Sequence, residues 1–137
     1  MTDEKPKHDY KSQGRKNRQA GKRFEKKVEE DLESKGWIVM RFAKQVDLVQ
    51  SKLINPKPHY NPFTKSIGYA GTGFPDFICF KQNDLDNFII QFIECKVNGS
   101  LSPIERDKCE WIQKNLHIPI SVASKGEKRG VINYETK

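Results

Sequence analysis

The sequence lacks the features of zinc-scaffolded, secreted and membrane-spanning proteins. Its three cysteines have no C-x-x-C spacing and its three histidines are scattered, so we do not expect a structural zinc site. No apolar run approaches the roughly 20 residues of a membrane span, and the first residues have no apolar stretch typical of a signal peptide. These absences favour a cytoplasmic protein of a reducing compartment, in which the cysteines behave as small apolar residues.

Basic charge is concentrated near the start of the chain. The 137 residues include 25 Lys and Arg against 18 Asp and Glu, a formal net charge of +7. Up to Lys27 there are ten basic and four acidic side chains, a net of +6. We expect residues 1–17 to form a flexible basic arm that captures a polyanion such as DNA or RNA, with a solvated leader as the alternative. Residues 18–137 have room for one domain with one modest core.

An amphipathic helix is predicted from Arg18 to Lys35, and Gly36 is expected to end it as a C-cap residue. Apolar residues recur at every fourth position and form one stripe, namely Ala20, Phe24, Val28 and Leu32. Glu25 lies at the flank of this stripe, from which its carboxyl can lean toward a sheet beneath the helix. An ordinary surface position for Glu25 is the alternative.

Short runs of apolar, aromatic and β-branched residues predict five strands. The strands are expected at residues 37–42, 77–80, 88–93, 118–124 and 131–134. A polar stretch over residues 81–87 connects the second and third of them as a hairpin. Between the third and fourth strands, Ser102, Pro103 and Glu105 form a capping box that begins a second helix.

An inserted segment at about residues 45–72 separates the first two strands. Residues 46–53 fit a short strand or a helical turn, and residues 55–63 fit a loop because three prolines remove backbone donors. Lysines and aromatic rings alternate in this segment, which is typical of surfaces that contact phosphates and unpaired bases. Rings that fold the loop onto the core are the alternative. Gly73 and the glycine two residues before it allow a close backbone approach just ahead of the next strand.

The residues expected to contact DNA lie in two places, the first helix and the inserted segment. They are Lys16, Arg18, Lys22, Arg23, Lys57, Tyr60, Lys65 and Thr72. Lysine and arginine side chains meet phosphates, whereas a ring such as that of Tyr60 stacks on bases.

Two acidic signals lie on the two strands that the hairpin joins. Asp76 follows Pro75 at the start of one strand, and Glu94 and Lys96 stand two residues apart at the end of the next. Because side chains alternate along a strand, Glu94 and Lys96 point the same way and Cys95 points the opposite way. Asp76, Glu94 and the Cys95 carbonyl can together hold Mg²⁺, for which Mn²⁺ is expected to substitute. Lys96 can then position or help to deprotonate an attacking water. A solvated strand end is the alternative.

The order of these elements resembles the PD-(D/E)xK nuclease superfamily, in which one strand carries Pro-Asp and the next carries Glu-x-Lys. This resemblance implies an α/β, restriction-endonuclease-like core with a central mixed β-sheet flanked by helices (αβββαβ). Residues 21–25 and 36–41 resemble the opening of archaeal-type Holliday-junction resolvases, whose G-x-x-x-E helix carries a catalytic glutamate. Residues 94–97 and 101–103, with Trp111 beyond them, resemble virus-type replication-repair nuclease domains, although the Gln common near Glu105 in that family is absent.

The resemblance also implies a role for each acid. Glu25 would be the helix-borne acid that binds the metal or its water, and Lys96 would be the catalytic lysine. Asp76 and Glu94 would be the metal ligands. The implied activity is that of a Mg²⁺-dependent endodeoxyribonuclease, selective for branched or junction DNA in recombination and repair and acting as a homodimer.

Two other functions remain open from the sequence. One is a nuclease for flaps, ends or specific duplex sequences, because all of these enzymes share the metal site. The other is a catalytically silent DNA-binding protein. A nucleoid-associated location follows from either, and a viral or mobile-element origin is compatible with both.

Overall fold

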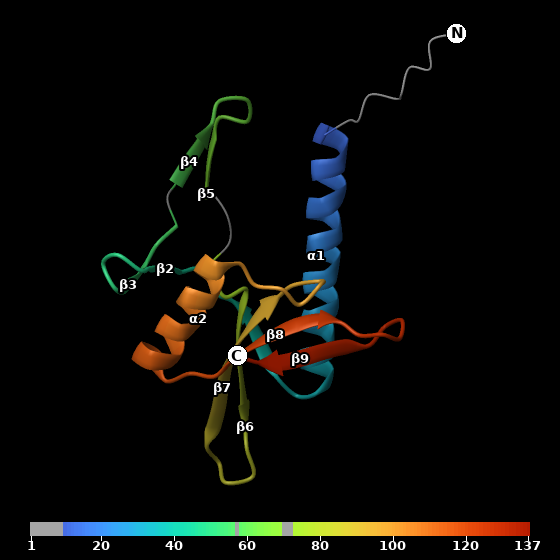
Figure 1. The fold of residues 1–137 in the computed structure, drawn as a ribbon, viewed down its shortest axis with the longest axis vertical. Helices are drawn as coiled ribbons and strands as arrows, with labels where there is room; N and C mark the ends of the chain where they lie inside the picture. The colour runs from blue at the N-terminus through green and yellow to red at the C-terminus, as the bar shows by residue number, and fades with distance from the viewer. Residues whose placement is uncertain (1–9, 57, 70–72) are drawn as a thin grey trace.

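The computed structural model describes residues 10–56, 58–69 and 73–137, and its fold is α/β (Figure 1). The main sheet has five strands in the order β1-β6-β7-β8-β9, in which β7 and β8 are parallel and the other neighbours are antiparallel. Its strands are β1 (Ile38–Arg41), β6 (Phe77–Gln82), β7 (Phe88–Cys95), β8 (Ile120–Lys125) and β9 (Ile132–Thr136). The predicted mixed sheet and its helix and strand order are confirmed, once the small hairpins of the insertion are set aside.

The helices α1 (Tyr10–Ser34) and α2 (Pro103–Leu116) cover opposite faces of this sheet. The buried cluster on the α1 side consists of Phe24, Val28, Leu32, Phe77, Cys79, Ile93 and Ala123. The buried cluster on the α2 side consists of Val46, Phe74, Phe92, Cys109, Ile112 and Ile120. Alternation along β7 sends Phe92 to one cluster and Ile93 to the other. Burying each such side chain stabilises the fold by about 1.5–3 kcal/mol relative to exposure.

Helix α1 begins at Tyr10 and not near Arg18, so the flexible arm expected over residues 1–17 is wrong for residues 10–17. This stretch contains no proline, and its Lys, Arg and Gln residues have good helix propensity. Extending an existing helix requires no new nucleation, so a polar stretch without an apolar stripe can still be helical. Although α1 has 25 residues, no helix in the described part of the chain is long and apolar enough to cross a membrane.

Helix α2 begins with the predicted capping box. The Ser102 hydroxyl accepts a hydrogen bond from the Glu105 amide at 3.2 Å, and the Glu105 carboxylate accepts one from the Ser102 amide at 3.0 Å. His117 ends the helix in the left-handed conformation, with φ of 55°. The cap fixes the start of α2, and with it the position of the Glu105 side chain.

The insertion forms two small hairpins. Strand β2 (Gln45–Asp47) pairs with β3 (Lys52–Ile54), and β4 (Pro58–Asn61) pairs with β5 (Ser66–Tyr69). Residues 46–53 were expected to form one short strand or a helical turn, and instead they form most of a hairpin, with a turn at residues 48–51 between its two strands. The expected loop over residues 55–63 is wrong for β4, because Pro58 is the first residue of a strand in a two-stranded sheet, where its missing N–H breaks no ladder.

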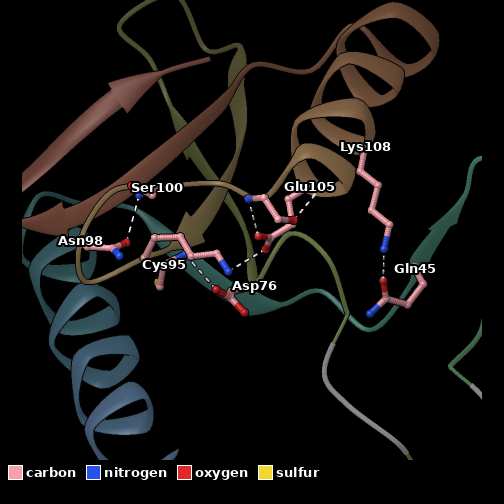
Figure 2. Close-up of polar contacts among 9 residues, drawn as sticks. Gln45, Asp76, Cys95, Asn98, Ser100, Glu105 and Lys108 are labelled. Atoms are coloured by element: carbon pink, nitrogen blue, oxygen red, sulfur yellow. Dashed lines mark hydrogen bonds and ion pairs between the residues drawn. The ribbon is translucent and has the colours of Figure 1, made fainter. Parts of the chain in front are cut away.

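Helix α2 anchors the first of these hairpins. The Lys108 ammonium donates a hydrogen bond to the Gln45 side chain at 3.3 Å, as Figure 2 shows, and the Trp111 ring N–H donates one to the Ser51 hydroxyl at 2.8 Å. The β4-β5 hairpin forms a separate two-stranded sheet and extends away from the main sheet (Figure 1).

Strand β9 is tied to α1 by a hydrogen bond between Tyr134 and Asp31. The Tyr134 hydroxyl donates to the Asp31 carboxylate at 2.6 Å, and the Lys35 ammonium donates to the same oxygen at 2.9 Å. Partial burial alone would raise the pKa of Asp31, but the hydrogen bonds from Tyr134 and Lys35 hold it below its ordinary value.

Tyr134→Phe is expected to lower the free energy of unfolding by about 1 kcal/mol at neutral pH, because a hydrogen bond to a partly exposed charged group is lost. The folded pKa of Asp31 is depressed, so this stabilisation is fully present above the ordinary value of 3.8 and disappears as pH falls through the folded value. Urea unfolding at neutral and acid pH measures the difference. Tyr60→Phe, at an exposed ring, is the matched control, and equal losses in both variants would contradict a role for the Asp31 contact.

Candidate active site

The first candidate acid, Asp76, is fixed between two strands of the main sheet. Its carbonyl accepts a hydrogen bond from the Phe42 amide at 3.0 Å, just beyond β1. Its carboxylate accepts a hydrogen bond from the Cys95 amide at 2.8 Å, at the end of β7 (Figure 2). The pairing of Phe77 with Ile93 brings Asp76 and Glu94 to the same end of the β6-β7 ladder. The prediction that these two acids lie on neighbouring strands is confirmed.

A close backbone approach precedes Asp76, as predicted for Gly73. The Phe74 amide donates to the Lys44 carbonyl at 2.9 Å. A Cβ atom on Gly73 would overlap the Phe42 carbonyl and lie 2.7 Å from the Lys44 carbonyl oxygen. Any side chain here would push the segment that carries Asp76 away from the end of β1.

The second acid, Glu94, is buried against Asp76 and is 5% exposed. Burial, then a hydrogen bond with Asp76 and repulsion from its charge, raise the pKa of Glu94 to about 10. Its Oε2 atom is buried and has no hydrogen-bond partner among the described residues. Without a cation, the pair is therefore most stable when one carboxyl is protonated, and one acceptor oxygen is left unsatisfied.

Glu94 and Lys96 both interact electrostatically with Glu105 of α2. Lys96 therefore lies on the same side of the sheet as Glu94, as predicted. The Lys96 ammonium forms an ion pair with the Glu105 carboxylate at 2.7 Å. Cys95 packs against the α1 cluster on the opposite side, which confirms the predicted alternation. The sequence indicated Glu105 only as a helix cap, and this second contact of its side chain was not predicted. The ion pair joins residues on different elements, so no local pattern indicates it.

Glu25 reaches the same centre from α1. Burial and repulsion from Asp76 raise the pKa of Glu25, and Arg41 and Lys22 oppose the rise. Both terminal nitrogens of Arg41 donate to the Glu25 carboxylate at 3.3 Å. The structure thus brings Glu25 near Asp76 and adds Arg41, a partner that the sequence analysis missed.

The two carboxyls of Asp76 and Glu94 are the groups here that could hold a cation. Among the described residues, no three His, Cys, Asp or Glu side chains come together as a metal-holding group. Two observations fit a divalent cation at the pair, namely the Glu94 oxygen without a partner among the described residues and the burial and repulsion that raise the pKa of Glu94. The contact of Cys95 with Asp76 is made through the amide, so a ligand role for its carbonyl stays a prediction.

The described residues among those predicted to contact DNA belong to α1 and to the insertion. Lys16, Arg18, Lys22 and Arg23 are all exposed on α1. In the insertion, Tyr60 is 58% exposed and Phe63 is 96% exposed, so these rings do not fold onto the core as the alternative proposed. Lys65 lies at the β4-β5 turn, with φ of 50°. Lys57 and Thr72 lie outside the described residues.

In a metal-free buffer, the free energy of unfolding is expected to fall as pH rises from about 4.5 toward about 10. Over this range the folded protein retains the Glu94 proton that the unfolded chain releases, so rising pH favours unfolding. Glu94→Gln keeps the shape but cannot titrate, and it is expected to flatten this profile. Thermal unfolding with a chelator measures the effect. Glu110→Gln on the exposed side of α2 is the control, and an unchanged slope in Glu94→Gln would refute the burial argument.

The chain matches no family model, and no curated protein or solved structure was found to match it. Its site is therefore characterised by its own geometry, a buried pair of carboxyls at one end of a mixed sheet with a lysine and a third carboxyl beside it.

Proposed function

We propose that this protein is a Mg²⁺-dependent endodeoxyribonuclease that hydrolyses DNA phosphodiester bonds. The observation that carries the proposal is the contact between the buried carboxyls of Asp76 and Glu94, with Lys96 on the same side of the sheet. Buried acids without a cationic partner destabilise a fold, so their presence together is best explained by a site that uses them.

Asp76 and Glu94 would hold the divalent cation, with Glu25 binding its water. When bound, the cation would supply Lewis acidity toward a phosphodiester. Asp76 is held in place by the Cys95 amide, so its carboxylate need not reorganise to bind. The Glu94 carboxyl would release its proton as the cation binds, because the positive charge stabilises the carboxylate against the burial and repulsion that raise its pKa.

Lys96 would neutralise negative charge that develops on the phosphoryl oxygens, or orient the attacking water. Its ion pair with Glu105 is about one-third exposed on the lysine side, so a phosphate can compete for the ammonium. Glu105 therefore holds Lys96 in position in the absence of substrate. Arg41 similarly holds Glu25.

The fold supports the same proposal at a coarser level. A mixed sheet flanked by helices, with acids at one end of two central strands, is compatible with a restriction-endonuclease-like core. We propose branched DNA, such as a four-way junction, as the substrate and a homodimer as the active form. Two symmetric cuts need two sites related by a two-fold axis.

Asp76→Asn and Glu94→Gln are each expected to lower DNA cleavage by more than about 10²-fold, because the cation and the charge it neutralises are lost. DNA binding should persist or strengthen, since a carboxylate that faces phosphate is repulsive. Cleavage of a four-way junction, a flap and a linear duplex, assayed in parallel with Mg²⁺, measures both activity and selectivity.

Glu110→Gln is the matched control for these assays and should behave as wild type. Wild-type cleavage by either site variant would refute the proposed site. Cleavage of flap or duplex in preference to the junction would retain the nuclease and reject the junction as its substrate.

Lys96→Ala is expected to lower the cleavage rate by about 10²–10⁴-fold, because a group that acts on the nucleophile or on transition-state charge is removed. Glu25→Gln should also lower the cleavage rate strongly. Glu29→Gln, one turn further along α1, should lower it only mildly. Single-turnover rates on the preferred DNA measure these effects. Similar rates for the two glutamate variants would show that Glu25 has no special role.

A further inference from the structure

The first half of α1 extends beyond the body of the protein. Burial on this helix begins at Phe24, and Ala20, one turn earlier, is exposed. In Figure 1 the blue end of α1 rises past the main sheet. Its exposed cations therefore have no core to pack on. No ion pair in the described part of the chain involves Arg15, Arg18 or Lys22.

These cations fall on two different flanks of the helix. At about 100° per residue, Arg15, Arg18 and Lys22 share an arc of about 80° with Glu25, on one side of the apolar stripe. Lys16, Arg23 and Lys27 share a separate arc, about 140° away from the first. We call the first set the Glu25 flank and the second set the outer flank.

The structure places the two flanks against different surroundings. On the Glu25 flank, Lys22 is close enough for its charge to act on the Glu25 carboxyl, and Glu25 in turn feels Asp76. On the outer flank, Lys27 lines a cavity of about 730 Å³ between α1 and the β8-β9 hairpin, together with Lys128 and Arg129. We call the carboxyls of Asp76 and Glu94 the acidic centre. Of the two flanks, only the Glu25 flank leads to it.

Neighbouring cations on this flank repel each other. Arg15 and Arg18 are three residues apart, and Arg18 and Lys22 are four apart, spacings at which like charges on a helix surface are destabilising. A bound polyanion would remove this penalty, which indicates an anionic partner that follows the helix axis.

We propose that the Glu25 flank, formed by Arg15, Arg18 and Lys22, is a track that binds successive phosphates of one DNA strand and guides that strand into the acidic centre. From Arg15 to Glu25 the helix rises about 15 Å, a length over which the axis of a duplex advances past about four phosphates of each strand. The outer flank lies outside this track, so Lys16 and Arg23, which the sequence led us to expect at DNA, are assigned no phosphate contact in this proposal. The destination of the strand rests on the proposed function, whereas the track itself does not.

The two flanks supply a matched pair of variants. Arg18→Ala with Lys22→Ala removes two cations from the track, and Lys16→Ala with Arg23→Ala removes two from the outer flank of the same helical segment. Alanine favours the helix in both cases, and circular dichroism verifies that α1 is retained. Fluorescence anisotropy of a short labelled DNA duplex, in chelator and over a range of salt concentrations, measures binding without cleavage.

The track variant is expected to bind more weakly, with a slope of log K against log salt that is shallower by about 0.9 for each lost phosphate contact. The outer-flank variant should keep the wild-type slope. Equal changes in both variants, or no change in either, would overturn the track. Tighter binding of an RNA duplex of the same length would overturn the assignment to DNA.

The binding test of the track and the cleavage test of the proposed nuclease can succeed or fail independently of each other. A protein that cleaves no DNA but shows the difference in slope retains the track and loses the proposed activity. A protein that cleaves DNA but shows equal slopes retains the activity and loses the track.

Discussion

The structure depends on a costly contact that the fold maintains, the burial of the Asp76 and Glu94 carboxyls against each other. The Cys95 amide and the hydrogen bonds at Phe42 and Phe74 hold one acid in position, and β7 delivers the other to the same place. Among the described residues, the buried Oε2 atom of Glu94 has no hydrogen-bond partner. A protein whose native state is only marginally stable retains such an arrangement where it serves a purpose, because neutral side chains would be less costly.

Local rules were sufficient for the parts of the site that lie on single elements. Strand alternation predicted that Glu94 and Lys96 share a side, and the capping box predicted the start of α2. The contacts of Lys96 with Glu105 and of Glu25 with Arg41 were not predicted, because each joins two elements whose relative position is set by the core. Sequence patterns describe one element at a time.

In the insertion and in the first half of α1, weak local sequence signals led to wrong predictions of secondary structure. Asp47 and Asn61 accept hydrogen bonds from the amides of the turns that follow them, a signal for the two hairpins that the nearby prolines obscured. In the first half of α1 the missing apolar stripe suggested disorder. A stripe reports packing rather than helix formation, so a polar extension of a packed helix escapes this criterion.

The insertion leaves the core at Lys44 and returns at Phe74, and these two residues are joined by a backbone hydrogen bond of 2.9 Å. The two ends of the insertion therefore lie side by side. The entropic cost of closing the loop between them grows only slowly with its length. The first hairpin belongs to the body, because Val46 lies in the buried cluster on the α2 side and α2 holds Gln45. The β4-β5 hairpin is a separate sheet, so changes in its size or sequence transmit little strain to Asp76. It is thus a replaceable accessory, free to diversify in evolution while the acidic centre keeps its geometry.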